Sequence, residues 1–171
     1  ARHSQPASGP ASPVLPPSPA DRKIKIPLTG GKIETYRQCP KKFQLSHLEK
    51  RGAGKAVSPH LSFDTSLHAA LKVFFKNRRK GELPRLENLL NALNGAWDNR
   101  GYTDIAEEQE WRRDAEAALR LFFSKIEIAF PNVHETDLFF KVDLFGAEYS
   151  GKIDRVDIKP DGSYEVIDYK T

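Results

Sequence analysis

The fold of this chain is decided by the stretch Gly151-Lys-Ile-Asp-Arg-Val-Asp-Ile-Lys-Pro-Asp-Gly-Ser-Tyr-Glu-Val-Ile-Asp-Tyr-Lys-Thr171. Apolar and polar residues alternate on both sides of a central Pro160-Asp161-Gly162, the pattern of two antiparallel strands joined by a tight turn. The stretch therefore predicts a β-hairpin. Asp154 lies on its first strand, and Asp168 and Lys170 lie on its second strand.

The turn sets the register of this hairpin. A three-residue loop at 160–162, with its glycine in the left-handed conformation, sets Asp154 opposite Asp168. A two-residue turn would instead set Arg155 opposite Asp168. We favour the three-residue loop because it also keeps the apolar side chains on a common face. These apolar residues are Val156, Ile158, Tyr164 and Val166.

In the favoured register, two carboxylates and one ammonium group gather on one face of the sheet. Facing side chains of antiparallel strands lie roughly 5 Å apart at Cβ, so Asp154 and Asp168 repel each other unless a cation lies between them. Lys170 is two residues from Asp168 and projects from the same face. This pattern suits a divalent metal bound beside a phosphodiester. A surface ion pair on a solvated sheet face is the structural alternative.

Composition narrows the class of protein. The chain has 171 residues, 39% of them hydrophobic and 29% charged, which suits one soluble, enzyme-like domain with a core of its own. No stretch approaches the roughly 18 apolar residues of a membrane span, so we expect no membrane partner. The single cysteine, Cys39, excludes an internal disulfide framework and favours an intracellular setting, which we take to be a bacterial cytoplasm. The net charge of +4 permits a polyanionic partner.

The chain divides into a tail and a domain. Residues 1–22 are rich in Ala, Ser, Pro and Gly, and this composition predicts a disordered linker. The sequence begins with Ala1 and contains no methionine, so we expect it to be an internal piece of a longer polypeptide. Residues 23–171 are predicted to form one domain.

Within this domain, helical periodicity gives way to strand periodicity after Pro131. Expected helices cover 32–39, 41–48, 62–79, 86–99 and 105–130, and residues 51–60 are expected to form a loop. Expected strands cover 138–144, 149–158 and 164–170. The order predicts an α+β fold, with an N-terminal helical block followed by an antiparallel three-stranded meander. Four phenylalanines at helical spacing are expected in the core: Phe74, Phe75, Phe122 and Phe123.

Four blocks of sequence, in this order, resemble the RecB-type (RecB/AddB-type) branch of the PD-(D/E)xK nuclease superfamily. They are Ile33-Glu-Thr-Tyr36-Arg-Gln-Cys39-Pro40-Lys-Lys-Phe43, Thr65-Ser-Leu-His68-Ala-Ala-Leu71, Gly151-Lys-Ile-Asp154-Arg155-Val-Asp157 and Val166-Ile-Asp168-Tyr169-Lys170-Thr171. In the second block, a glycine that is usual in the family is replaced by Asp64 or Thr65. The resemblance covers residues 29–171 and implies a restriction-endonuclease-like fold. The family core continues past the D-x-K motif, so the fold is expected to be C-terminally incomplete, with an uncovered edge at its third strand.

The resemblance implies a site and a reaction. His68, Asp154, Asp168 and the backbone carbonyl of Tyr169 would coordinate Mg²⁺ or Mn²⁺. Lys170 would position the attacking water, and with the two aspartates it would form the catalytic set. Taken alone, a histidine such as His68 is more often a structural helix residue. Members of this branch cut DNA, as linear double-stranded ends or single strands, and many are fused to or partnered with a UvrD-like helicase in repair and recombination.

Each of the other candidate residues has two possible interpretations on the sequence. Some relatives hold a 4Fe-4S cluster through a cysteine that matches Cys39, but this residue also suits a small buried position. Tyr36, Lys41 and Lys42 are candidate DNA contacts, and packing or a solvated charged face explains them as well. Arg155 is either a phosphate contact or a partner in a structural salt bridge.

The functional hypothesis is a metal-dependent DNA nuclease attached to helicase-related repair machinery. Two alternatives stay open on the sequence. One is an inactive nuclease-like module that binds single-stranded DNA or scaffolds a repair complex. The other is a nuclease that acts on RNA or on invading nucleic acid.

Overall fold

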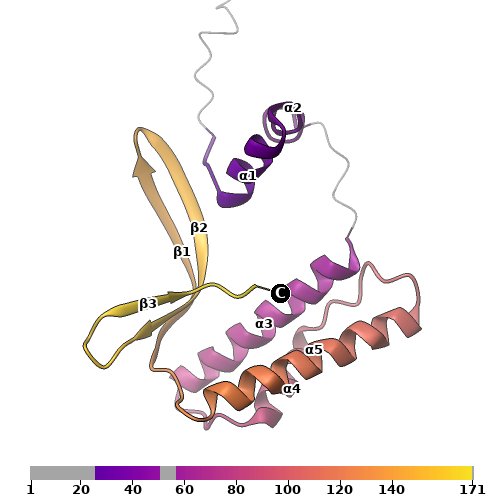
Figure 1. Ribbon diagram of the computed structural model, residues 1–171, viewed down its shortest axis with the longest axis vertical. Helices are drawn as coiled ribbons and strands as arrows, with labels where there is room; N and C mark the ends of the chain where they lie inside the picture. Colours follow the sequence, from indigo (N-terminus) through magenta and orange to yellow (C-terminus); the bar gives the residue numbers. More distant parts are fainter. Residues whose placement is uncertain (1–25, 51–56, 171) are drawn as a thin grey trace, which may run out of the picture.

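The computed structural model describes residues 26–50 and 57–170. The predicted linker, residues 1–22, lies outside these ranges. In the described ranges a block of helices is followed by an antiparallel sheet (Figure 1), so the predicted α+β class is confirmed. The elements are α1 (Gly30–Gln38), α2 (Pro40–Phe43), the π-helix η2 (Gln44–Leu48), α3 (Pro59–Arg79), α4 (Leu86–Ala96), α5 (Ile105–Ile126), β1 (Val133–Leu144), β2 (Ala147–Ile158) and β3 (Tyr164–Ile167).

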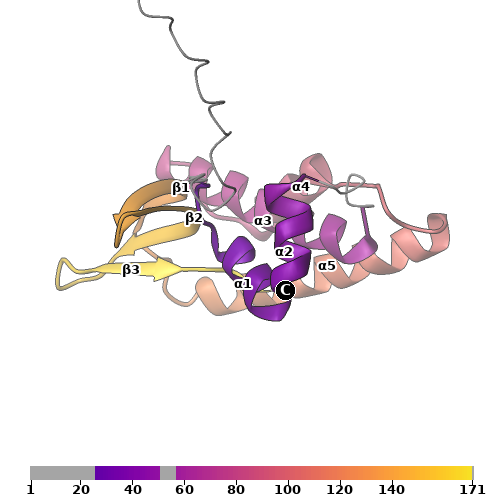
Figure 2. The same ribbon diagram turned by 90° about the horizontal axis from the view of Figure 1, so that it is seen from above.

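The hydrophobic core lies between α3, α4 and α5, which pack together beside the sheet (Figures 1 and 2). Apolar side chains recur on one face of each helix, so that packing the three faces together removes them from water. Each such leucine or phenylalanine contributes about 1.5–3 kcal/mol through burial. The buried members are Leu67, Ala70, Leu71, Phe74, Phe75, Leu89, Leu93, Ala115, Leu119 and Phe123, and Phe122 packs against them. The four phenylalanines are therefore core residues, as predicted.

Two helix boundaries were predicted wrongly at the N-terminal side of the core. Helix α3 begins at Pro59, inside the expected loop, because Ser58 caps it: the Ser58 hydroxyl accepts a hydrogen bond of 3.3 Å from the Leu61 amide. Proline at the first helical position has the backbone angle that a helix needs. Helix α1 likewise begins at Gly30, after its N-cap Thr29. Both starts follow cap signals that helical periodicity alone does not include.

The C-terminal ends of two helices also differ from the prediction. Helix α4 ends at Ala96, not 99, because the backbone of Trp97 is extended. This conformation lets the Trp97 indole donate a hydrogen bond of 3.0 Å to Glu108 on α5. Helix α5 ends at Ile126, not 130, and the segment that follows leads into β1, with half-buried Phe130 packed against the core.

The sheet has the order β1-β2-β3, and the predicted register of its second hairpin is confirmed. Val156 pairs with Val166, and the turn contains Gly162 with φ +82°. The Gly162 amide donates to the Lys159 carbonyl at 2.9 Å, which closes the three-residue loop. The register follows from local turn chemistry, because a left-handed position strongly favours glycine.

The third strand is shorter than expected. We predicted a strand to Lys170, but β3 ends at Ile167. The reason is a change of partner: the Tyr169 amide donates its hydrogen bond to the side chain of Asp154, at 2.8 Å from Oδ2. Residues 168–170 therefore leave the sheet and turn toward α3 (Figure 1).

The N-terminal segment reaches the sheet through Leu28. Its amide donates to the Glu148 carbonyl at 2.7 Å, and its carbonyl accepts from the Ser150 amide at 2.8 Å. These bonds form a parallel bridge to Tyr149 on β2. The bridge places α1 beside the part of the sheet that carries the predicted site.

Candidate active site

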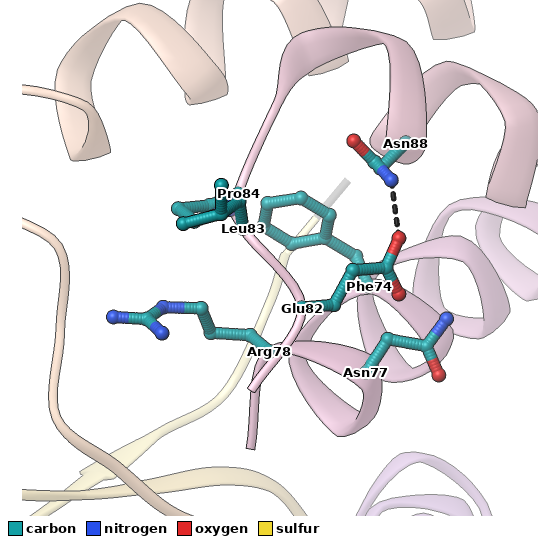
Figure 3. Close-up of a pocket in the computed structure, with 7 residues that line it drawn as sticks. All are labelled: Phe74, Asn77, Arg78, Glu82, Leu83, Pro84 and Asn88. Carbon is teal, nitrogen blue, oxygen red and sulfur yellow. Dashed lines mark hydrogen bonds between the residues drawn. The ribbon is translucent and has the colours of Figure 1, made fainter. Parts of the chain in front are cut away.

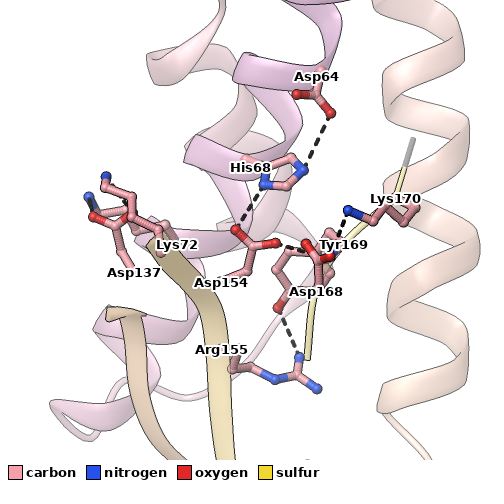
Figure 4. Close-up of polar contacts among 10 residues, drawn as sticks. Asp64, His68, Lys72, Asp137, Asp154, Arg155, Asp168, Tyr169 and Lys170 are labelled. Carbon is pink, nitrogen blue, oxygen red and sulfur yellow. Dashed lines mark hydrogen bonds and ion pairs between the residues drawn. The ribbon is translucent and has the colours of Figure 1, made fainter. Parts of the chain in front are cut away.

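The predicted site residues on α3 and β2 are in direct contact. His68 Nδ1 lies 3.1 Å from Asp154 Oδ1, and His68 Nε2 lies 3.4 Å from Asp64 Oδ1. Asp64 is four residues before His68, so both side chains project from the same face of α3. The imidazole therefore lies between two carboxylates (Figure 4). His68 and Asp154 are 86 positions apart in the sequence, so only the tertiary fold brings them together.

The second predicted carboxylate lies next to the first. The register of β2 and β3, continued by one residue beyond the Arg155–Ile167 pair, places Asp168 opposite Asp154. The Lys170 ammonium, 2.6 Å from Asp168 Oδ2, holds the pKa of the Asp168 carboxyl below its ordinary value. Partial burial opposes this effect, and a hydrogen bond with the Asp154 carboxyl adds to it. The same contact raises the pKa of Lys170, so both groups stay charged.

Tyr169 anchors this segment to the helical core. Its ring packs edge-on against His68 and against Phe122, with centroid distances of 5.8 and 6.0 Å. Its hydroxyl accepts a hydrogen bond of 3.1 Å from Arg155, and burial raises the pKa of Tyr169 to about 12. The residues on either side, Asp168 and Lys170, remain exposed. The half-buried ring thus holds two exposed charged side chains in place.

Arg155 belongs to the interior of the protein. It is 7% exposed, its guanidinium lies over the Phe75 ring at 4.4 Å, and its Nε lies 3.0 Å from Asp157 Oδ1. This contact is an ion pair without the alignment of a hydrogen bond. The buried position favours the structural salt bridge over the phosphate contact, because a phosphate would have to reach Arg155 through the core.

A pocket of about 350 Å³ opens beside His68 and Asp154. Its lining is strongly charged and comes from α3, β1, β2 and the segment after β3. The lining residues are Asp64, Thr65, His68, Ala69, Lys72, Asp137, Lys152, Asp154 and Tyr169. Asp168 and Lys170 line a neighbouring pocket with Thr29 and Gly30, and Lys152 borders both pockets.

The donor groups fit a hard divalent cation by their chemistry, since carboxylate and carbonyl oxygens are its preferred ligands. Their present arrangement is different. In residues 26–50 and 57–170, no three His, Cys, Asp or Glu side chains form a set that could hold a metal ion. Asp154 is engaged by His68 and the Tyr169 amide, and Asp168 by Lys170. Binding a cation would exchange these contacts for metal–ligand bonds.

Sequence comparison agrees with this geometry. Residues 27–171 match the profile of the PD-(D/E)XK nuclease superfamily. The chain belongs to this superfamily. Its members are generally nucleases that use divalent metals such as Mg²⁺ or Mn²⁺, and the α+β architecture is consistent with a restriction-endonuclease-like fold. No curated protein sequence matches the chain.

The sequence block around Cys39 contributes to the local structure of α1 and α2. Half-buried Cys39 caps α2, and its Sγ accepts a hydrogen bond of 3.4 Å from the Lys42 amide. Tyr36 is 55% exposed and packs edge-on against Phe43. The side chains of Lys41 and Lys42 are exposed on α2. These positions support the packing interpretation for Cys39, and the DNA contacts remain predictions.

Sequence reasoning missed two residues of the pocket beside His68 and Asp154. Asp64 could have been found from its i, i+4 spacing to His68 on a predicted helix. Asp137 lies outside the expected first strand, which was predicted to begin at Leu138 but begins at Val133. Glu135 on β1 forms an ion pair with Arg79 and so ties β1 to α3.

A second pocket lies between the end of α3 and the start of α4 (Figure 3). Its volume is about 10 Å³, the space of a single water molecule. Glu82 there accepts a hydrogen bond from Asn88, which joins the α3–α4 connection to α4. This pocket is too small for a substrate of the superfamily.

Among the described residues, no helix combines the length and apolar character needed to cross a lipid bilayer.

Proposed function

We propose that the protein is a metal-dependent DNA nuclease of the RecB type that hydrolyses phosphodiester bonds in DNA repair or recombination. One observation carries the proposal: Asp154 and Asp168 meet across the hairpin, with His68 on the first carboxylate and Lys170 on the second. A structural hairpin gains nothing from two facing carboxylates. Membership of the nuclease superfamily supports the same reading.

The residues have distinct proposed roles. His68, Asp154, Asp168 and the Tyr169 carbonyl would hold Mg²⁺ or Mn²⁺. When bound, such a cation lowers the pKa of a coordinated water and offsets the charge that builds on the phosphorus centre. Lys170, held by Asp168, would orient the attacking water through an N–H group. The Asp64–His68 contact would fix the imidazole ring, as partners of ligating histidines do in other sites.

The substrate and the partner follow from the resemblance to the RecB branch. We infer DNA as the substrate, as linear ends or single strands, and a UvrD-like helicase as the partner. The net charge of +4 is compatible with a polyanionic substrate. The iron–sulfur cluster would need ligands in addition to Cys39, because the chain has one cysteine.

A second function is favoured by one specific observation. The carboxylates of the site already have protein partners, and the described residues present no ready-made metal set. A nuclease-like module that binds single-stranded DNA without cutting it would look like this. Both functions include DNA binding, so only a measurement of cleavage distinguishes them.

The deciding experiment measures cleavage of linear DNA by the intact protein with Mg²⁺ or Mn²⁺. Asp168→Asn and Lys170→Ala should abolish cleavage. Glu165→Gln and Lys159→Ala change a second exposed ion pair of the same hairpin, 3.3 Å apart, and should cut like the wild type. Equal activity in all four variants would show that the nuclease assignment of these residues is wrong. DNA binding without cleavage by the wild type would favour the binding module.

A further inference from the structure

Three charged side chains from three elements meet at the wall of the site pocket. Asp137 on β1 contacts the Lys72 ammonium of α3 through Oδ2 and the Lys152 ammonium of β2, at 3.0 Å, through Oδ1. Figure 4 shows Lys72 and Asp137 beside the His68–Asp154 contact. One carboxylate thus bridges two lysines.

The register of the sheet explains why this cluster lies beside the site. Thr136 pairs with Arg155, and Leu138 pairs with Ile153, so Asp137 is opposite Asp154. Lys152 is two residues before Asp154 on β2 and projects from the same face. Both lysines line the pocket that contains His68 and Asp154, and Lys152 also borders the pocket of Asp168 and Lys170.

The backbone of Asp137 is unusual. Its φ is +57°, a left-handed conformation that costs free energy for a residue other than glycine, although aspartate tolerates it better than most. The conformation occurs inside a strand, between two paired residues. Such a position persists where surrounding contacts over-determine it, and the two lysines supply these contacts.

The cluster has an excess of positive charge that faces solvent. The side chains of Lys72 and Lys152 are 44% and 61% exposed, and a single carboxylate is shared between them. Each ammonium group carries three N–H donors, and the contact with Asp137 uses one. Two ammonium groups held by one carboxylate suit the tetrahedral oxygens of a phosphate.

We propose that Lys72, Asp137 and Lys152 form a phosphate clamp that binds a backbone phosphate of the substrate strand next to the bond that is cut. The two lysines contact the phosphate, and Asp137 positions them. The clamp sets the strand so that the neighbouring phosphodiester lies over Asp154 and Asp168. This inference rests on the proposed nuclease function and adds a substrate-binding subsite to it.

The test is the salt dependence of binding to a fluorescein-labelled single-stranded DNA oligonucleotide in EDTA, where no cleavage occurs. The test variant is Lys72→Gln/Lys152→Gln, in which each glutamine can still donate to Asp137, so that the fold is kept. The matched control is Lys141→Gln/Lys159→Gln. These control lysines are also exposed and paired with carboxylates, Glu148 and Glu165, and the change in net charge is identical.

Each neutralised phosphate contributes roughly 0.7 to the magnitude of the slope of log K against log salt for a single strand, and the two lysines share one phosphate, so the slope of the test variant should be smaller by about 0.7. The control should keep the wild-type slope. Equal slopes in the two double variants would overturn the clamp and leave Lys72 and Lys152 as a structural tie between α3 and the sheet.

Asp137→Asn tests the positioning role, because asparagine also accepts the left-handed backbone. This variant should keep the salt slope, since both lysines remain, while kcat for cleavage falls at least tenfold. An unchanged kcat would contradict the positioning role of Asp137. If the salt slopes of DNA binding are as expected but the wild type never cleaves DNA, the result would support the clamp and reject the nuclease function. If the wild type cleaves DNA but the two double variants have equal salt slopes, only the clamp would be rejected.

Discussion

The Tyr169 amide donates a hydrogen bond of 2.8 Å to Asp154 Oδ2 and thereby joins the segment that carries Asp168 and Lys170 to the strand that carries Asp154. This amide would otherwise be available to extend β3, but it donates to a side chain instead. The bond fixes one oxygen of Asp154, and His68 contacts the other oxygen at 3.1 Å. Both oxygens of this carboxylate therefore have defined directions before any substrate binds.

This relationship predicts different costs for two substitutions of Asp154. Asp154→Ala leaves the partly buried Tyr169 amide without a partner and should lower the free energy of unfolding by about 1–3 kcal/mol. Asp154→Asn keeps an acceptor oxygen and should cost about 1 kcal/mol or less. Urea unfolding followed by circular dichroism measures both. Glu165→Ala, at an exposed position of β3, is the control and should be neutral; equal costs for the two Asp154 variants would contradict the role of the bond.

The half-buried side chain of Tyr169 predicts a loss of stability at alkaline pH. Burial raises its pKa to about 12, above the value of about 10 for an exposed tyrosine. Its contribution to stability is fully present below pH 10 and is lost as the pH rises toward 12, because only the unfolded chain releases the proton in this range. The free energy of unfolding should fall by about 1.4 kcal/mol per pH unit from this group.

The alkaline effect is isolated by comparing Tyr169→Phe with the wild type in urea titrations between pH 9 and about 12. The variant lacks the ionisable group and should show a shallower decline. Tyr164→Phe, at an exposed tyrosine on β3, should decline like the wild type. Parallel curves for wild type and Tyr169→Phe would show that the hydroxyl ionises as easily in the folded protein as in the unfolded chain.

The buried ion pair of Arg155 and Asp157 predicts strong coupling between these two positions. Arg155→Met leaves Asp157, 6% exposed, as an unpaired charge and should cost about 3–5 kcal/mol. Arg155→Met/Asp157→Leu removes both charges and should recover most of this loss. The free energies of unfolding of the single and double variants form a double-mutant cycle.

An exposed pair on the same hairpin provides the comparison for this cycle. Lys159 and Glu165 lie 3.3 Å apart, and Lys159→Met should change stability by less than about 1 kcal/mol. Additive effects at Arg155 and Asp157 would mean that the two charges do not stabilise each other.

Cation binding can be followed without cleavage, through the thermal midpoint of the wild type in rising Mn²⁺. A ligand that binds only the folded state stabilises by about 2.7 kcal/mol at 100 times its Kd, so the midpoint should rise by several degrees. Asp154→Asn and Asp168→Asn should remove the rise, and Asp143→Asn, near the β1–β2 turn, should retain it. A rise that is equal in all three variants would place the cation elsewhere.

The residues that the sequence predicted best are those whose placement depends on their neighbours in the chain. Pro160-Asp161-Gly162 specifies a three-residue loop, and the register with Val156 opposite Val166 follows from it. The phenylalanines of α3 and α5 were assigned to the core from spacing alone. Helix ends were less accurate, because caps such as Ser58 and extended residues such as Trp97 compete with periodicity.

The sequence by itself determined the α+β order, the hairpin register and the superfamily motifs. Only the tertiary structure decided that His68 lies against Asp154, that Arg155 is buried beneath Tyr169, and that Asp137 joins Lys72 to Lys152. The physical reason is sequence separation. Turn geometry and side-chain alternation act over a few residues, whereas a contact across 86 residues forms only when the packing of α3 against the sheet brings its two partners together.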